Sequence, residues 1–194
     1  MRRHAVVLRS GVSKRQVVAL LDEQFGRVDY LVRSPREILG TLISYQLHST
    51  YRYTYMIDIC IEGSPLAIAH HDLLFLHHVL EICYVCIPIG SCTDGIFALL
   101  QSLYQSHEVP LGRQYKKLFL YRLLSQLGVS SGQYHMSRAT VQQIQTFSID
   151  SFVEESLHLE HERDLDVWLR YSVAEYTNPK QLKTIHFLNQ SRIA

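Results

Sequence analysis

The chain has 194 residues, of which 47% are hydrophobic, and its formal net charge is +1 at pH 7. This length and apolar content are sufficient to bury a core, which excludes a tail or a fibrous protein. The basic start MRRHAVVLRSG has too short an apolar run for a signal peptide, and no later segment has the ~20 apolar residues of a membrane span. The four cysteines lack the density of a disulfide scaffold. We therefore expect a soluble cytoplasmic protein.

Short segments with period-two alternation precede residue 69, and turn residues separate them. They include HAVVLRS, RVDYLVRS, TLISYQLH and YRYTYMIDIC. About five strands in roughly 65 residues predict a small closed barrel. In the last of these segments the alternation predicts that Tyr55, Ile57 and Ile59 fill the barrel, whereas Arg52 lies on the outer face. Tyr51 and Tyr53 lie toward the open barrel end, where they would be partly exposed.

The segment SKRQVVALLDEQF has a different pattern. Ser13 and Gln16 have the spacing of a capping box, and apolar residues from Val17 to Phe25 share one helical face. Periodicity alone therefore predicts a helix here.

After residue 69 the apolar period becomes helical. The run HHDLLFLHHVLEICYVCI predicts a mostly buried helix, with Asp72 in its first turn. Further helices are predicted at TDGIFALLQSLYQSH, at GRQYKKLFLYRLLSQLG ending at Gly128, at MSRATVQQIQTF, at LDVWLRYSVAEY and at PKQLKTIHFLNQ. The sequence thus predicts the α+β class, with a barrel domain at residues 1–69 and an all-α domain at 70–194.

Cysteines and histidines are the candidate metal ligands. Cys83 and Cys86 form a C-x2-C, which Cys60 and Cys92 would have to complete. The pair lies inside an apolar helix, however, where a tetrahedral thiolate site is difficult to form. The histidines occur as the adjacent pairs His70/His71 and His77/His78 and lack the i, i+4 spacing of helical metal sites. Buried thiols and hydrogen-bonded histidines are the favoured interpretation, so no metal or cofactor is expected.

Hydrolase and phosphate-loop motifs are absent from the sequence. The acidic run between Glu154 and Asp166 is typical of a solvated helix face. An enzyme is therefore the weaker hypothesis.

Basic residues are in excess at the N-terminal end. Residues 1–69 hold nine Lys and Arg against six acids. A basic barrel surface with aromatic residues is typical of proteins that bind single-stranded nucleic acid, although scattered arginines can also serve only solubility. The candidate DNA-binding residues are Lys14, Arg15, Arg27, Arg33, Arg36 and Arg52.

Several runs, in order, resemble the RecO family of bacterial recombination mediators. The run AVVLRSGVSKRQVVALLDEQFGRVDYLVRSPRE resembles the opening strands of that family. DLLFLHHVLEICYVCIPIGS, IFALLQSLYQ and KKLFLYRLLSQLGV resemble its central helices, and NPKQLKTIHFLNQ is similar to its closing segment. The likeness covers most of the chain.

The resemblance implies an N-terminal OB barrel, a helical C-terminal domain and a strand where periodicity predicts a helix at 15–25. It also implies binding and annealing of single- and double-stranded DNA. The implied partners are RecR, the C-terminal tail of the single-strand-binding protein and, indirectly, a RecA-type recombinase. An acidic, apolar tail requires cations beside an apolar groove, which favours Lys116, Lys117 and Arg122 as its contacts.

The chain departs from the family in its cysteines. Many members carry a four-cysteine zinc site after the Leu-Gly helix, but GVSSGQYHMS contains no cysteine. Zinc is therefore not carried over. The alternative to a DNA-binding mediator is a helical protein-interaction module whose small barrel does not bind nucleic acid.

Overall fold

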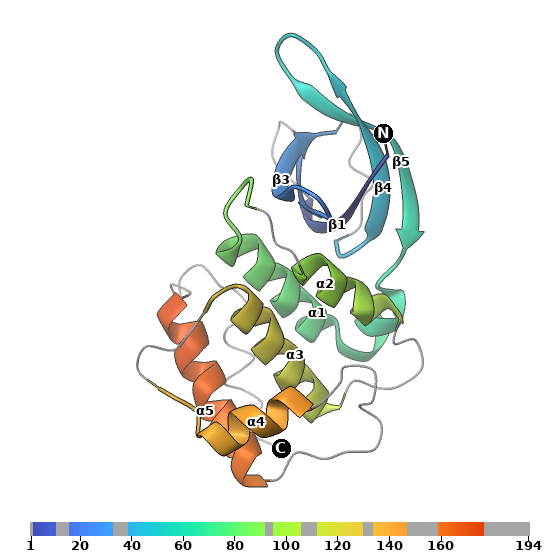
Figure 1. The fold of residues 1–194 in the computed structure, drawn as a ribbon. Helices are drawn as coiled ribbons and strands as arrows, with labels where there is room; N and C mark the ends of the chain where they lie inside the picture. The colour runs from blue at the N-terminus through green and yellow to red at the C-terminus, as the bar shows by residue number, and fades with distance from the viewer. Residues whose placement is uncertain are drawn as a thin grey trace. The chain divides into compact units, whose positions relative to one another are not determined.

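The computed structural model describes residues 2–10, 16–32, 39–91, 95–105, 112–129, 134–146 and 159–176 (Figure 1). Within these ranges the chain forms five strands followed by five helices. They group into two compact units, which divide between Val109 and Pro110. The first unit holds the strands and the first two helices, and the second holds the last three helices.

The five strands close into a barrel in the order β1-β2-β3-β5-β4. Their bounds are Arg3–Ser10 for β1, Val17–Asp22 for β2, Gly26–Leu31 for β3, Leu42–Ser49 for β4 and Thr54–Gly63 for β5. Neighbouring strands are antiparallel except β3 and β5, which run parallel and pair at Leu31 and Tyr55. The predicted α+β class, with a small barrel followed by helices, is confirmed.

The segment for which periodicity predicts a helix is strand β2, so the helix prediction is wrong and the strand implied by the resemblance is right. Residues 18–22 are all buried, which means that both faces of this strand are covered. A strand buried on both faces has a continuous apolar run and no period-two signal. The apolar run of β2 therefore fits a helical period as well as a strand.

Side chains from all five strands or their ends fill the barrel. Val28 and Tyr30 of β3 pack against this core. Burial of each such apolar side chain contributes roughly 1.5–3 kcal/mol. The buried core residues are Ala5, Val7, Val18, Leu20, Val32, Ile43, Tyr45 and Met56.

Strand β5 does not keep the alternation that its sequence predicts. Met56 is buried in the barrel, whereas Tyr55 and Ile57 face outward and are only half-buried. Asp58 then adopts a φ of +50°, and the pairing with β4 shifts between Ser44 and Gln46, as in a β-bulge. The bulge returns Ile59 to the core side. Of the three residues predicted to fill the barrel, only Ile59 packs against the core.

A buried carboxylate closes the β2–β3 end of the barrel. Asp22 is 1% exposed and accepts hydrogen bonds from the backbone N–H groups of Gln24 and Phe25, each at 2.9 Å. Its second oxygen accepts the Tyr45 hydroxyl at 2.5 Å. Burial, together with the Asp22 charge, raises the pKa of Tyr45. Asp22 thus fixes the turn between two strands and pairs a core tyrosine.

Helices α1 (Leu66–Cys86) and α2 (Ile96–Gln105) pack against β1 in the first unit (Figure 1). Asp72 is not in helical conformation, and its carboxylate instead caps the following turn by accepting the N–H of Phe75 at 2.9 Å. The Tyr104 hydroxyl of α2 donates to the carbonyl of Gly40, whose φ is +79°. A Cβ at Gly40 would lie 3.2 Å from the side chains of Leu80 and Pro65, and the left-handed φ favours glycine at this contact.

The second unit contains α3 (Arg113–Gln126), α4 (Arg138–Thr146) and α5 (Leu159–Tyr176). Gly128 ends α3 as predicted: its φ is +72°, and its N–H donates to the carbonyl of Ser125. The predicted helices at 112–128, 136–147 and 165–176 correspond to these three helices. The segment predicted at 179–190 lies outside the described residues. None of the described helices has the length and apolar character needed to cross a membrane.

The change from strands to helices falls between Gly63 and Leu66, close to the predicted domain boundary at residue 69. The compact units divide later in the chain, because α1 and α2 group with the barrel.

Candidate functional site

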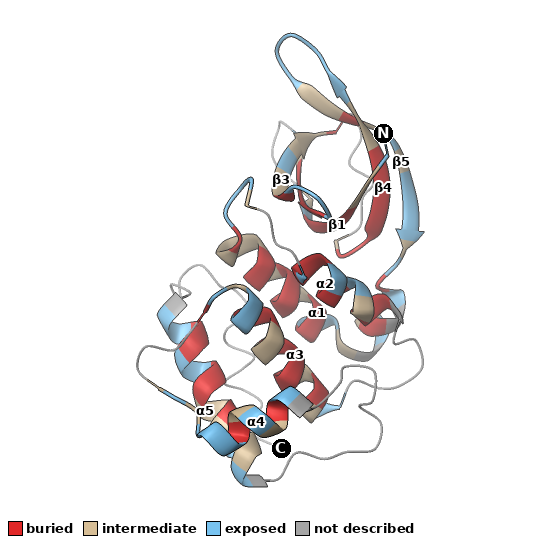
Figure 2. Ribbon diagram, viewed as in Figure 1, coloured by how far each residue is buried: buried red, intermediate tan, exposed pale blue. Residues whose placement is uncertain are grey.

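Residues 48–53, at the end of the hairpin formed by β4 and β5, are exposed (Figure 2). His48 lies opposite Tyr55, and Tyr53 contacts the edge of the Tyr55 ring at a centroid distance of 6.1 Å. Leu47 and Met56, on the other face of the hairpin, belong to the barrel core. We call His48, Tyr53 and Tyr55 the aromatic face. It is accessible to a ligand because the hairpin extends beyond the rest of the barrel (Figure 1).

The tip of this hairpin consists of Tyr51 and Arg52, both exposed. Tyr51 is 101% exposed, as much as in an extended peptide, and Tyr53 is 54% exposed. Within the described part of the chain no acidic side chain forms an ion pair with Arg52. Arg52 is exposed, but it lies in the turn before β5 and not on the outer face of the strand, and the tip offers one cation beside aromatic rings.

Arg27, a predicted DNA contact, has a structural role. Its side chain is only 12% exposed. The guanidinium donates to the carbonyls of Tyr84 and Ile87 at the C-terminal end of α1, and it lies 4.1 Å from the centre of the Tyr84 ring. Carbonyls at a helix C-terminus attract a cation. Arg27 thus holds α1 against the barrel.

The remaining predicted DNA contacts, Lys14, Arg15, Arg33 and Arg36, lie outside the described residues. Residues 11–15 and 33–38 hold these four cations and one acid, Glu37. The other residues up to 69 hold five cations and five acids. The entire basic surplus of three therefore belongs to these two connecting segments of the barrel.

Of the predicted partner contacts, Lys117 is neutralised by its own chain. It is 8% exposed, and its Nζ lies 2.5 Å from Glu162 and 2.8 Å from Asp166 on α5. The hydrogen bond from Lys117 lowers the pKa of Glu162. A fully paired ammonium cannot attract an acidic peptide, so Lys117 serves the packing of α3 on α5. Lys116 and Arg122 are half-buried on the same helix.

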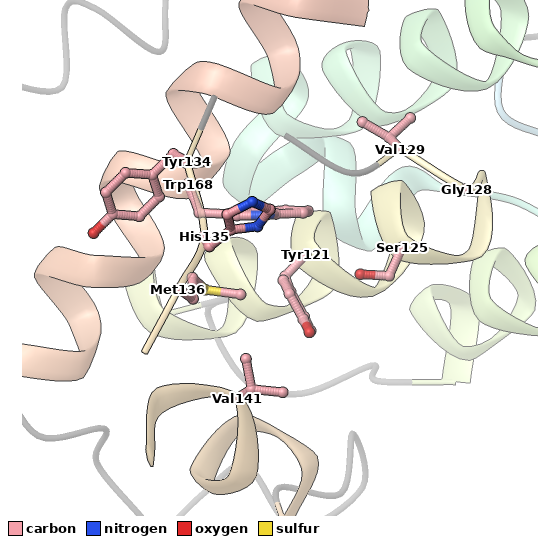
Figure 3. A pocket seen from close by; sticks show the side chains of 9 residues that line it. All are labelled: Tyr121, Ser125, Gly128, Val129, Tyr134, His135, Met136, Val141 and Trp168. Atoms are coloured by element: carbon pink, nitrogen blue, oxygen red, sulfur yellow. The ribbon is translucent and has the colours of Figure 1, made fainter. Parts of the chain in front are cut away.

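An open pocket of about 370 Å³ lies between α3, α4, α5 and the segment 134–136 (Figure 3). Tyr121 meets the ring of Trp168 edge-on at 5.0 Å between centroids, and these rings form one wall with Met136 and Val141 nearby. Ser125 of α3 also lines the pocket, and Arg122 lies one turn before it on the helix. The complete lining is Tyr121, Ser125, Gly128, Val129, Tyr134, His135, Met136, Val141 and Trp168.

Asp164 of α5 holds the 134–136 wall in place. Its carboxylate accepts the Tyr134 hydroxyl and, at 2.9 Å, the backbone N–H of Ser137. Burial raises the pKa of Asp164, but hydrogen bonds from Tyr134, Thr140 and Ser137 outweigh burial and keep the pKa below its usual value. The Ser137 hydroxyl in turn caps α4 by accepting the N–H of Thr140. The pocket wall is therefore fixed at neutral pH.

The cysteines and histidines form no common site among the residues that the structure describes. Burial raises the pKa values of Cys83 and Cys86, so their thiols stay protonated. His78 is 4% exposed, and burial lowers its pKa to about 4 despite an opposing effect of Glu81. Cys60 is exposed on β5.

Comparison of the chain with protein-family models and with curated proteins finds no match. The resemblance to the RecO family thus rests on the quoted runs and stays a prediction.

Sequence reasoning missed two features of the candidate site. Tyr55 of the aromatic face was expected to point into the barrel, because the alternation of the sequence does not show which of its two faces is buried. The pocket was missed because its lining comes from four separate segments. A signal was available for the hairpin: the break His48-Ser49-Thr50 between two alternating segments marks a tight connection, whose corner residues are exposed.

Proposed function

We propose that the protein is a nucleic-acid-binding recombination mediator of the RecO type whose barrel is an OB fold. The observation that carries this proposal is the aromatic face of the β4–β5 hairpin with Arg52 at its tip. The strand order β1-β2-β3-β5-β4 and the small size of the barrel support an OB fold, and the β4–β5 connection of such folds is a place where oligonucleotides bind.

The aromatic face has the chemistry of a stacking platform. Base–aromatic stacking is worth about 1–3 kcal/mol per base and tolerates any sequence, since every base has a π-face. Arg52 and the cations of residues 11–15 and 33–38 would neutralise phosphates. Contacts to phosphates gain affinity from released counterions, so this affinity falls as the salt concentration rises. Because these contacts do not involve the base edges, the bases stay free to pair with a second strand. A moderate basic surface of this kind suits a protein that anneals strands.

Fluorescence anisotropy with labelled single-stranded DNA at low and moderate salt tests this function. We expect the parent protein to bind more weakly as the salt concentration rises. In a variant, the slope of log affinity against log salt concentration should become shallower by about 0.7 for each phosphate that is no longer neutralised. The variant Arg52→Ala should leave one such phosphate without its cation. The combined variant of Lys14, Arg15, Arg33 and Arg36 to Ala should lose most of the affinity.

Arg170→Ala is the matched control, because it removes an exposed arginine of the second unit and leaves the barrel unchanged. If all these variants bind single-stranded DNA as the parent does, the nucleic-acid site is not on the barrel. If the parent itself does not bind DNA at low salt, the alternative of a protein-interaction module is favoured.

The pocket of the second unit supports a partner in the same process. We propose that it receives the acidic, apolar tail of the single-strand-binding protein, with an apolar side chain between Tyr121 and Trp168 and Arg122 beside the tail carboxylates. Lys117 is not included, because Glu162 and Asp166 already neutralise it. RecR and a RecA-type recombinase remain proposed partners that follow from the resemblance.

Anisotropy with a labelled tail peptide tests this contact. Val141→Glu places a carboxylate in the pocket and should abolish binding, whereas Gln142→Glu adds the same charge to an exposed position of α4. Equal weakening in both variants would indicate general charge repulsion and would place the tail elsewhere. Arg122→Ala should weaken binding, and more so at low salt.

A further inference from the structure

The tip of the β4–β5 hairpin is a short, internally bonded turn. The N–H and the hydroxyl of Thr50 both donate to the carbonyl of Tyr53, at 2.8 and 2.9 Å. The Thr50 hydroxyl also accepts the N–H of Tyr53 at 3.2 Å. One step further down, the hydroxyls of Ser49 and Thr54 lie 3.2 Å apart. These contacts close the turn around Tyr51 and Arg52.

Tyr51 has a different position from the other tyrosines of the hairpin. Tyr53 immediately precedes β5, and its ring meets the ring of Tyr55 on that strand edge-on, so successive bases of a flexible single strand could stack along the two. Tyr51 lies in the connection itself, beyond the end of the paired strands, and is wholly exposed. A single ring at the end of a rigid hairpin presents one flat apolar surface and is not part of a row.

The end of a duplex is the nucleic-acid surface that matches such a ring. The last base pair next to a single-stranded tail has one face that no base pair covers, so a ring can stack there in place of an unpaired base without breaking any base pair. Insertion of a ring inside a continuous duplex would instead require unstacking, which costs free energy. A guanidinium next to the ring can bind the phosphate at which the two strands part.

We propose that the hairpin tip recognises the junction between single-stranded and double-stranded nucleic acid. Tyr51 stacks on the terminal base pair, Arg52 binds the junction phosphate, and the aromatic face receives the unpaired strand. This assignment rests on the proposed nucleic-acid-binding function and gives it a preferred substrate. In strand annealing, a ring on the last pair would stabilise the end of the duplex as it forms.

The test compares a single strand, a blunt duplex, and the same duplex with a single-stranded tail, each labelled for anisotropy. The parent protein should bind the tailed duplex most tightly. Tyr51→Ala should weaken binding to the tailed duplex about tenfold, which is the scale of a single base–aromatic stack, and should change binding to the single strand less than about twofold. Tyr51→Trp should retain or strengthen the junction preference, because tryptophan also presents a flat ring.

Tyr53→Ala is the matched control, since it removes a neighbouring exposed tyrosine from the aromatic face. It should weaken binding to the single strand and to the tailed duplex equally. A fluorescent base analogue in the terminal pair gives a second measurement: its emission should change when the parent protein binds and should not change with Tyr51→Ala.

The outcomes distinguish this assignment from the function on which it rests. Equal weakening of all three DNAs by Tyr51→Ala, or no weakening, would show that the protein binds DNA but that Tyr51 does not recognise a junction. Tighter binding to the single strand than to the tailed duplex would overturn the assignment in the same way. If none of the three DNAs binds to the parent, both the assignment and the proposed function fail.

Discussion

Two sides of the same barrel use similar residues for different purposes. On the β1–β2 side, residues 5–8 and 18–22 are buried on both faces, and α1 and α2 pack against β1 (Figure 2). On the β4–β5 side residues 42–45 are also buried, but residues 48–53 at the end of the hairpin are exposed. Arg27 of β3 and Tyr84 of α1 contact each other within the fold, whereas Arg52 and Tyr53 face solvent. An arginine or tyrosine therefore indicates a ligand-binding surface only where its side chain is not engaged in contacts within the fold.

The largest effect is expected from the buried carboxylate of the covered side. Asp22→Ala leaves two backbone N–H groups and the Tyr45 hydroxyl without their acceptor. Removal of three hydrogen bonds to a buried charged group should lower the free energy of unfolding by about 3–4 kcal/mol. Urea unfolding followed by circular dichroism measures this change. Glu23→Ala, at an exposed position of the same turn, should stay within about 0.5 kcal/mol of the parent.

If Asp22→Ala were as stable as Glu23→Ala, the turn would not depend on its carboxylate. The covered side would then be stabilised by apolar packing alone.

Acid should weaken the same unit through His78, which is buried in α1. Its pKa is about 4 in the folded protein, against about 6.5 for an exposed histidine, so between these values the unfolded state binds a proton that the folded state does not. The free energy of unfolding should fall as the pH decreases from about 6.5 to about 4, by about 3 kcal/mol in total. Urea unfolding at a series of pH values should show this fall.

His78→Leu should make the stability less dependent on pH over this range. A variant that retains the slope of the parent would assign the acid sensitivity to other groups.

Arg27→Ala should have the third-largest effect. It removes two hydrogen bonds to the end of α1, the contact with the Tyr84 ring and an ion pair at 3.7 Å with Asp29. We expect the free energy of unfolding to fall by about 2 kcal/mol. Arg27→Lys keeps the charge but not the planar fork, so it should recover only part of this stability. Complete abolition of DNA binding with unchanged stability would contradict the structural role of Arg27.

The sequence predicted the barrel and most helices because these depend on local patterns. It did not predict β2, whose two buried faces leave no alternation, or the inward position of Met56. The role of Arg27 depends on Tyr84, 57 residues away in the chain, and that of Lys117 on Glu162, 45 residues away. Such distant partners cannot be inferred from spacing. The lining of the pocket comes from four segments, so the pocket could not be predicted from the sequence either.

The smallest effect on stability is expected at the exposed hairpin. Substitutions there should weaken DNA binding strongly while they leave the free energy of unfolding almost unchanged. The double variant Tyr51→Ala, Arg52→Ala removes two side chains that make no contact with the barrel core, so the free energy of unfolding should change by less than about 0.5 kcal/mol. The same variant should bind the tailed duplex at least tenfold more weakly, since it forgoes about 1–3 kcal/mol of stacking and the neutralisation of one phosphate. Urea unfolding and anisotropy on one preparation measure both quantities. Destabilisation comparable to that of Arg27→Ala would show that the hairpin tip supports the fold, because a side chain that serves only a ligand can be removed without cost to the folded state.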